Sequence, residues 1–244
     1  MKIGLQIYTL RDIISEGYDK ILKEVAEIGY KGVEMTYSPD DGDKVAELLK
    51  KYGLKGTSAH ISIDEIENNF ERASGFLDKI GSKSMIVPWI DGKVIETEEK
   101  TIETAKRFET VAKKVAERGY ELGFHNHTIE FEKKFGSRTV MDIFYDEAPS
   151  LKFQIDCGWA FAAGADVIAI LNKFGDRLSC IHIKDVDANK TPTEVGNGKV
   201  DMKAVLATAN KYGVEWGIVE QDHCVNHKPL DAVKISYDYI QTII

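Results

Sequence analysis

Short strand-like runs alternate with amphipathic helical segments along the whole 244-residue chain. The strand-like runs are expected at residues 3–8, 32–36, 54–60, 84–88, 120–126, 151–156, 178–184 and 215–220. The helical segments that follow them are expected near 18–28, 42–52, 64–80, 97–118, 139–147, 165–174, 201–212 and 229–243. Strands that alternate with helices pair in parallel through right-handed crossovers. Eight such units predict one closed (β/α)8 TIM barrel, whose usual size is about 250 residues.

The ends of the predicted helices agree with this arrangement. A glycine follows a helical stretch and precedes a strand at several places, where a left-handed residue commonly ends a helix. These glycines are Gly29, Gly53, Gly81, Gly119, Gly175 and Gly213. Asp201 is placed to cap the helix that follows it. No Pro-rich linker or change in composition divides the chain, so we expect a single domain over residues 1–244.

The main structural alternative is an open, doubly wound parallel sheet. That fold usually carries a Gly-rich first turn, whereas the first turn here reads Tyr-Thr-Leu-Arg-Asp at residues 8–12. The barrel is therefore favoured. Its longest stretch without predicted structure is 185–200, and long loops in compact domains are often functional.

Charge and cysteine content restrict the partners. The net charge is −8, from 32 basic and 40 acidic residues, which argues against the basic surface that holds a nucleic-acid backbone. No apolar run approaches the ~18 residues of a membrane span, and we find no secretory signal pattern. Cys157, Cys180 and Cys224 show no Cys-x-x-Cys spacing, so free thiols in the reducing cytoplasm are expected. Exterior helices can form a dimer surface without a periodic signature, so the sequence leaves open whether the chain forms a homo-oligomer.

Side chains of a barrel strand alternate between the surrounding helices and the barrel interior. Apolar residues take the helix-facing positions, as Leu5 and Ile7 do in the first strand. The other positions are polar near the carboxyl ends of most strands, the face that carries the active site of barrel enzymes. These inward residues are Gln6, Glu34, His60, His125, His127, Asp156, His182, Lys184 and Glu220. Crowded carboxylates would repel one another unless a cation lay between them.

Carboxylates and an imidazole from separate strands make a mixed oxygen and nitrogen site. Such a donor set suits Mn²⁺, Mg²⁺, Co²⁺ or Zn²⁺ better than a metal that prefers thiolates. The sequence therefore predicts one divalent metal ion at the mouth of the barrel.

Several short motifs, in their order and spacing, resemble those of a known family. They are Leu-Gln-Ile-Tyr-Thr-Leu-Arg-Asp at 5–12, Gly-Phe-His-Asn-His-Thr-Ile-Glu-Phe at 123–131, Ile-Asp-Cys-Gly-Trp at 155–159, Ile-His-Ile-Lys-Asp at 181–185, Glu-Val-Gly-Asn-Gly-Lys-Val-Asp at 194–201 and Val-Glu-Gln-Asp at 219–222. Over nearly its whole length the chain resembles the sugar phosphate isomerase/epimerase family, the xylose isomerase-like TIM barrels.

The resemblance implies a metal held by Glu, Asp, His and Glu at the ends of strands five to eight. Asp156, His182 and Glu220 match this pattern. Many relatives have a Glu at the end of the fifth strand where this chain has His125. Glu130 is the nearest carboxylate and completes the expected ligand set, with His125 and His127 as the alternatives. Trp159 replaces the His of an Asp-x-x-His motif, which argues against a strict ketose epimerase.

The resemblance also implies proton transfer at a carbon next to the carbonyl of a small sugar or keto-sugar. Glu130 and Glu220 are the expected acid/base pair, with Glu34 or His127 as non-ligating alternatives. The residues expected to contact substrate are Gln6, Glu34, His60, His125, His127, Trp159 and Lys184. An ion pair that balances the charge of the mouth is the other interpretation of Lys184.

The sequence leaves three outcomes of that chemistry open, namely epimerisation, isomerisation and dehydration. It also leaves open a sugar-binding barrel without catalysis and, less favoured by the net charge, a DNA-repair endonuclease on the same fold. Gly196-Asn197-Gly198-Lys199 could cradle a phosphate through backbone N–H groups. A tight turn before the helix that Asp201 caps is the simpler interpretation.

Overall fold

The structure, a computed structural model, describes residues 1–244 and contains a closed barrel of eight parallel strands. In chain order the strands are β1 (Lys2–Gln6), β2 (Gly32–Thr36), β3 (Lys55–His60), β4 (Ser84–Val87), β5 (Glu121–His125), β8 (Lys152–Asp156), β9 (Leu178–Ile183) and β12 (Trp216–Val219). Each strand overlaps the segment that the sequence predicts. β1 closes the barrel by pairing with β2 on one side and with β12 on the other.

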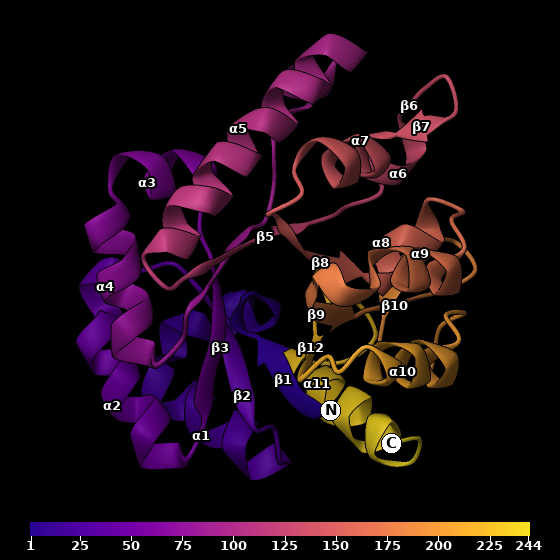
Figure 1. The fold of residues 1–244 in the computed structure, drawn as a ribbon. Helices are drawn as coiled ribbons and strands as arrows, with labels where there is room; N and C mark the ends of the chain where they lie inside the picture. Colours follow the sequence, from indigo (N-terminus) through magenta and orange to yellow (C-terminus); the bar gives the residue numbers. More distant parts are fainter.

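An outer ring of helices surrounds the barrel (Figure 1). The helices that alternate with the strands are α1 (Tyr18–Ile28), α2 (Gly42–Tyr52), α4 (Phe70–Ile80), α5 (Glu98–Glu117), α7 (Val140–Glu147), α9 (Val167–Phe174), α10 (Met202–Lys211) and α11 (Pro229–Gln241). Gly53 and Gly81 end their helices with φ of 68° and 76°, the left-handed conformation that favours glycine. Asp201 caps α10 by accepting from the backbone N–H of Ala204. The (β/α)8 prediction is confirmed.

The structure differs from the prediction in several connecting segments. One helix is predicted over 64–80, but the chain forms α3 (Ile63–Asn68) and α4, because Asn69 has φ −134° and ψ 40° between them. Residues Ile7–Glu16 form 3₁₀ turns after β1. Three further short elements were not predicted either. They are α6 (Ile129–Glu132), α8 (Cys157–Ala162) and the two-stranded ribbon of β6 (Lys134–Phe135) and β7 (Arg138–Thr139).

The segment 185–200 is more ordered than the sequence predicts. β10 (Asp185–Val186) and β11 (Pro192–Thr193) form a short antiparallel ribbon within it. The Asp185 carboxylate then accepts from the backbone N–H groups of Gly196, Gly198 and Val200 at 3.0–3.1 Å. A Cβ at Gly198 would collide with this carboxylate. The N–H groups that could cradle a phosphate therefore hold a carboxylate of the chain itself, which agrees with the tight-turn interpretation.

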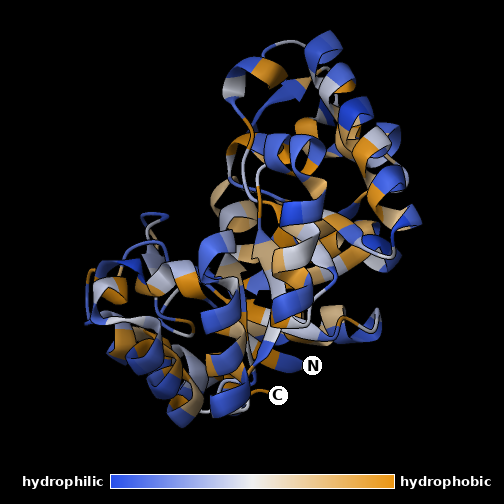
Figure 2. Ribbon diagram, turned by 90° about the vertical axis from the view of Figure 1, so that its left-hand side faces the viewer, coloured by the Kyte–Doolittle hydropathy of each residue, from blue (hydrophilic) through white to orange (hydrophobic).

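The apolar core fills the layer between the strands and the helices. Phe108 of α5, Phe124 of β5 and Phe144 of α7 show its packing, with ring centroids 4.7–5.3 Å apart. The helices carry hydrophobic and hydrophilic residues on different sides (Figure 2), as expected where one face packs on a sheet. None of the helices combines the length and apolar character needed to cross a membrane.

Candidate metal centre and cavity

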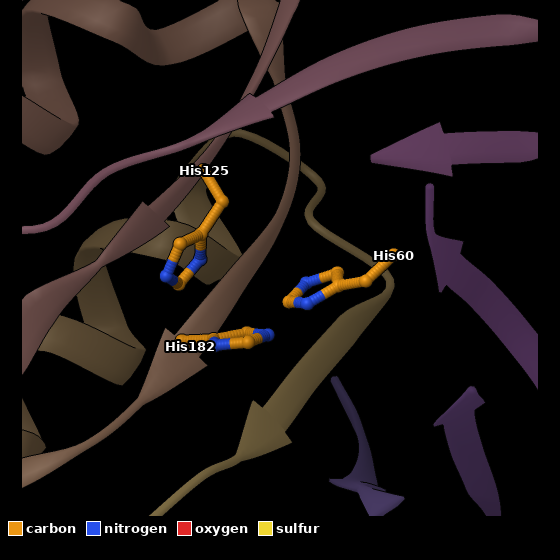
Figure 3. A group of neighbouring side chains, drawn as sticks. All are labelled: His60, His125 and His182. Carbon is orange, nitrogen blue, oxygen red and sulfur yellow. The ribbon is translucent and has the colours of Figure 1, made fainter. Parts of the chain in front are cut away.

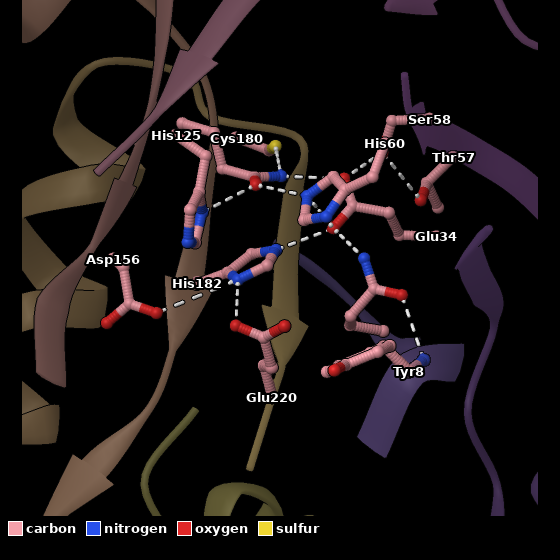
Figure 4. Close-up of polar contacts among 12 residues, drawn as sticks. Tyr8, Glu34, Thr57, Ser58, His60, His125, Asp156, Cys180, His182 and Glu220 are labelled. Carbon is pink, nitrogen blue, oxygen red and sulfur yellow. Dashed lines mark hydrogen bonds and ion pairs between the residues drawn. The ribbon is translucent and has the colours of Figure 1, made fainter. Parts of the chain in front are cut away.

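Four polar side chains converge at the carboxyl ends of neighbouring strands. His125 ends β5, Asp156 ends β8, His182 lies in β9 and Glu220 follows β12. One ligand atom from each lies within 4.8 Å of those of the other three, and all four residues are buried. Figure 4 shows these side chains pointing toward one another. Strand parity predicts an inward direction for all four side chains, and the structure brings them together at the mouth.

His182 lies at the centre of this group. Its Nε2 is 2.6 Å from Glu34 Oε2, and its Nδ1 is 2.9 Å from Glu220 Oε2 and 3.8 Å from Asp156 Oδ2. Burial alone would lower the pKa of His182, but the charges of Glu220 and Glu34 raise it well above its ordinary value. The imidazole is therefore held between carboxylates at both of its nitrogens.

Glu34 is saturated with hydrogen-bond donors. Besides His182, its carboxylate accepts from Gln6 Nε2 at 2.7 Å, Ser58 Oγ at 2.6 Å and Gln154 Nε2 at 2.7 Å. His60 Nε2 lies 3.1 Å from Glu34 Oε2. Burial raises the pKa of Glu34, but the two imidazoles outweigh it and hold that pKa well below its ordinary value. Gln6 and Glu34 are thus occupied with one another and do not line the cavity described below.

Gln154 is a member of this network that the sequence analysis missed. Its Nε2 donates to Glu34 and to Cys180 Sγ, while its Oε1 is 2.9 Å from His125 Nδ1 and 3.0 Å from His60 Nε2. A carboxylate can only accept, so the amide nitrogen faces Glu34 and the amide oxygen faces the imidazoles. Gln154 shares the inward parity of Asp156, two residues on, and this signal could have found it.

The Gln154 oxygen also determines the state of His125. His125 must donate Nδ1–H to this acceptor, which leaves its Nε2 lone pair free. Burial, together with the nearby His182 and His127, lowers the pKa of His125 well below its ordinary value. His125 is therefore neutral and able to act as a ligand.

Lys184 lies among the carboxylates and does not line the cavity. Its buried Nζ is 2.9 Å from Asp156 Oδ2, 2.8 Å from Glu220 Oε2 and 2.7 Å from Asp222 Oδ2. The Trp159 ring lies over this ammonium, with its centroid 4.6 Å from Nζ. The position of Lys184 therefore agrees with the ion-pair interpretation. Trp159 packs over Lys184 and lies outside the cavity. Burial opposes the ionised form of Asp156, but Lys184 outweighs it and lowers the pKa to about 2.

The group of four is able to bind a divalent metal ion. Two carboxylates and two imidazoles are a donor set that proteins use for such ions. Asp156 Oδ2 is buried and faces Lys184 Nζ at 2.9 Å and His182 Nδ1 at 3.8 Å, so part of the charge of the group is already neutralised. A carboxylate behind a ligating imidazole, as Glu34 stands behind His182, is a common support in metal sites.

Glu130 lies outside this group, in α6. Its Oε2 accepts from the backbone N–H of His127 at 2.8 Å, and its Oε1 is buried without a partner. Burial raises the pKa of Glu130. The structure thus places His125, the alternative considered from the sequence, with the other three residues in the position expected for Glu130.

A cavity of about 340 Å³ opens beside the group, a volume suited to a small molecule. It is lined by Tyr8, Thr36, His60, Pro88, Trp89, His125, His127, Glu220 and Asp222. Three of the residues expected to contact substrate, His60, His125 and His127, lie in this wall. Trp89 is 60% exposed and was missed, although Pro88 and Trp89 directly follow β4 at the mouth of the barrel.

Comparison with known proteins agrees with this architecture. An inosose dehydratase of Mesomycoplasma hyopneumoniae (strain 7448) is 26% identical, over 93% of this chain and 89% of the relative. A sugar phosphate isomerase/epimerase from Parabacteroides distasonis superposes with a TM-score of 0.86 at 20% identity, covering 98% of this chain and 93% of that one. The 3-keto-D-glucoside 4-epimerase of E. coli superposes with a TM-score of 0.74 at 19% identity, covering 99% of both chains.

Those solved structures are similar in fold, and the family is shown by the sequence itself. The sequence model of one family matches residues 22–242, a span that includes every strand of the barrel except β1. This chain belongs to the xylose isomerase-like TIM barrel family.

Proposed function

We propose that this chain is a metal-dependent isomerase or epimerase that moves a proton at a carbon next to the carbonyl of a sugar or keto-sugar. The observation that carries the proposal is the convergence of His125, Asp156, His182 and Glu220 within 4.8 Å, beside a cavity that two of them line. Cation ligands beside a small-molecule cavity are what such chemistry requires.

In this proposal His125, Asp156, His182 and Glu220 hold the ion. When bound, a divalent ion supplies a Lewis acid that favours negative charge on the carbonyl oxygen. Glu34 and Gln154 hold the imidazoles in place from behind, through His182 Nε2 and His125 Nδ1. Lys184 limits the repulsion among the carboxylates and is itself kept from substrate by burial.

Glu220 and His127 are the proposed proton-transfer pair. Both line the cavity. The contacts of Glu220 with His182 and Lys184 are made by Oε2, so Oε1 remains to accept a proton. Burial lowers the pKa of His127, and its buried Nδ1 has no partner, so a neutral imidazole faces substrate. Glu130, the other half of the pair expected from the sequence, acts in this proposal by holding the backbone of His127.

Return of the proton to the opposite face gives an epimer, and its return to the neighbouring carbon gives an isomer. Dehydration is the second candidate, in which removal of the proton is followed by loss of hydroxide from the adjacent carbon. The inosose dehydratase that matches 93% of this chain favours this candidate. Both candidates begin with the same proton abstraction, so one experiment tests them together.

The experiment is solvent deuterium exchange. Protein loaded with Zn²⁺, Co²⁺ or Mn²⁺ is incubated in D₂O with ketohexoses, 3-keto-glycosides and inososes, and the sugars are analysed by NMR and mass spectrometry. Carbon-bound deuterium in a sugar of unchanged composition supports the isomerase or epimerase. A product that has lost water supports the dehydratase. Absence of both with every sugar and metal would overturn the proposal, and His182→Ala is the inactive control.

A further inference from the structure

We infer that the centre is built with two imidazole ligands and therefore selects borderline ions such as Zn²⁺ or Co²⁺ over the hard ions Mg²⁺ and Mn²⁺. The inference rests on the metal centre of the proposed function and adds which ions it takes. It follows from His125, which supplies a nitrogen where the family resemblance implies a carboxylate oxygen.

The first support is the direction of the His125 lone pair. Gln154 Oε1 takes the Nδ1–H of His125 at 2.9 Å, and the Gln154 amide cannot turn over without placing its oxygen against the Glu34 carboxylate. Nε2 is therefore the free nitrogen of His125. The two side chains that settle this, Gln154 and Glu34, are both fully buried.

The second support is the orientation of His182. Glu34 Oε2 holds its Nε2 at 2.6 Å, which leaves Nδ1 facing Glu220 at 2.9 Å and Asp156 at 3.8 Å. Buried partners therefore fix both rings, so that His125 Nε2 and His182 Nδ1 are the nitrogens that face the group of four. Imidazole nitrogen favours Zn²⁺ and Co²⁺, whereas Mg²⁺ and Mn²⁺ favour oxygen.

The third support is the charge of the centre. Asp156 and Glu220 are the only carboxylates in the group of four, and the Lys184 ammonium lies within 2.9 Å of both. Hard ions are bound mainly through the charge and number of oxygen ligands. A centre with two carboxylates that already share an ammonium therefore offers less to Mg²⁺ or Mn²⁺ than to an ion that bonds well to nitrogen.

A third imidazole lies nearby but is otherwise engaged. His60, His125 and His182 also form a close group (Figure 3). The Nε2 of His60 is 3.0 Å from Gln154 Oε1 and 3.1 Å from Glu34 Oε2. We therefore count two imidazoles as ligands and leave His60 with the supporting network.

The direct test is X-ray absorption at the zinc edge of the wild-type protein loaded with Zn²⁺. The multiple-scattering pattern counts imidazole ligands, and two are expected. One imidazole would overturn the inference, and so would three, because the third would place His60 on the metal. This measurement uses the unaltered chain and does not depend on how a variant folds.

A competition experiment tests the selectivity. Chelator-treated protein is dialysed against equal concentrations of Zn²⁺, Co²⁺, Mn²⁺ and Mg²⁺, and bound metal is measured by mass spectrometry. Most sites prefer Zn²⁺ to Mn²⁺, so the decisive quantity is the change in the Zn/Mn ratio on His125→Glu. A fall of about tenfold or more is expected. An unchanged or higher ratio contradicts the inference. The matched control, His227→Asn, alters an exposed imidazole outside the cavity and the group of four and should leave the ratio unchanged.

The outcomes separate this inference from the proposed function. Two imidazoles on the metal without deuterium exchange in any sugar would leave the inference standing and remove the function. Deuterium exchange into a sugar at a centre with a single imidazole ligand would support the function and remove the inference. A protein that binds no metal under any loading condition would remove both.

Discussion

Two layers of buried polar residues, a lower one inside the barrel and an upper one beyond the carboxyl ends of its strands, differ in how completely their atoms are paired. In the lower layer, Gln6, Ser58 and Gln154 surround Glu34 and fill its acceptor sites. In the upper layer, several buried polar atoms make no hydrogen bond. These atoms are His127 Nδ1, Glu130 Oε1, Trp159 Nε1 and Gln221 Oε1, whereas Asp156 Oδ2 and Asp222 Oδ2 are paired with the Lys184 ammonium.

Buried polar groups without partners are costly, so native proteins seldom keep several in one place. His127, whose Nδ1 is among them, lines the cavity, which indicates that this part of the upper layer is arranged for a ligand. The lower layer is arranged for stability and for the orientation of His182 and His125. The difference teaches that a buried carboxylate must be judged by its partners before it is assigned a chemical role.

The largest expected effect tests the upper layer. Glu220→Gln removes the proposed proton acceptor, so deuterium exchange should fall by about 10²–10⁴-fold. The free energy of unfolding should fall by less than about 1.5 kcal/mol, because Lys184 keeps Asp156 and Asp222 as partners. Exchange rates and urea unfolding measure the two effects. A variant that unfolds readily would contradict the division between the layers.

The next effect tests the lower layer. Glu34→Ala leaves His182, Ser58 and Gln154 without their common acceptor, and should lower the free energy of unfolding by about 3–5 kcal/mol. Urea unfolding measures it. The control is Glu215→Ala, which breaks an exposed pair with Lys2 and should cost less than about 1 kcal/mol. Similar losses in both variants would show that the Glu34 network contributes little.

A third variant asks whether pairing, rather than position along the barrel, decides the role of a carboxylate. Asp185 lies in the loops at the mouth, yet its oxygens are fully used by backbone N–H groups. Asp185→Ala should cost about 2–3 kcal/mol. Hydrogen exchange should become faster at the amides of Gly196, Gly198 and Val200. Unchanged protection of these amides would mean that the loop holds its shape without the carboxylate.

The smallest effect concerns Glu194, another paired carboxylate at the mouth. Burial raises its pKa, but its own backbone N–H, His227 and Thr193 outweigh burial and lower it to about 2 from 4.5. Because the folded-state pKa is the lower one, its stabilisation is present above pH 4.5 and is lost as the pH falls toward 2. Glu194→Gln should remove about 1 kcal/mol at neutral pH. The difference in stability from wild type should vanish in acid, and a constant difference would contradict this assignment.

Much of the fold could be predicted because it depends on periodic features. Alternating strands and helices, and the glycines that end the helices, determine a barrel through local patterns. The break at Asn69 and the short helix after Asp156 could not be predicted in the same way. They depend on single dihedral angles and on one side chain, since Asp156 caps α8 by accepting from Trp159 N.

The candidate site was predicted in part for a similar reason. Strand parity identified Asp156, His182 and Glu220, because alternation along a strand determines which way each side chain points. Strand parity also pointed to His125, whereas the family resemblance favoured Glu130, which lies beyond the strand in α6, where direction depends on the path of the chain. Strand parity also could not show that Lys184 is buried. Its burial depends on three carboxylates that come together only in the folded chain.

The buried thiol of Cys180 lies inside the closed barrel and can report when the barrel opens. It lies buried against Gln154, whereas Cys224 is partly exposed in the loop after β12. An alkylating reagent can reach Cys224 in the folded chain but reaches Cys180 only when the barrel wall separates. The rate at which Cys180 is modified therefore measures how often the barrel opens. Any ligand that bridges β5, β8 and β9 should lower this rate.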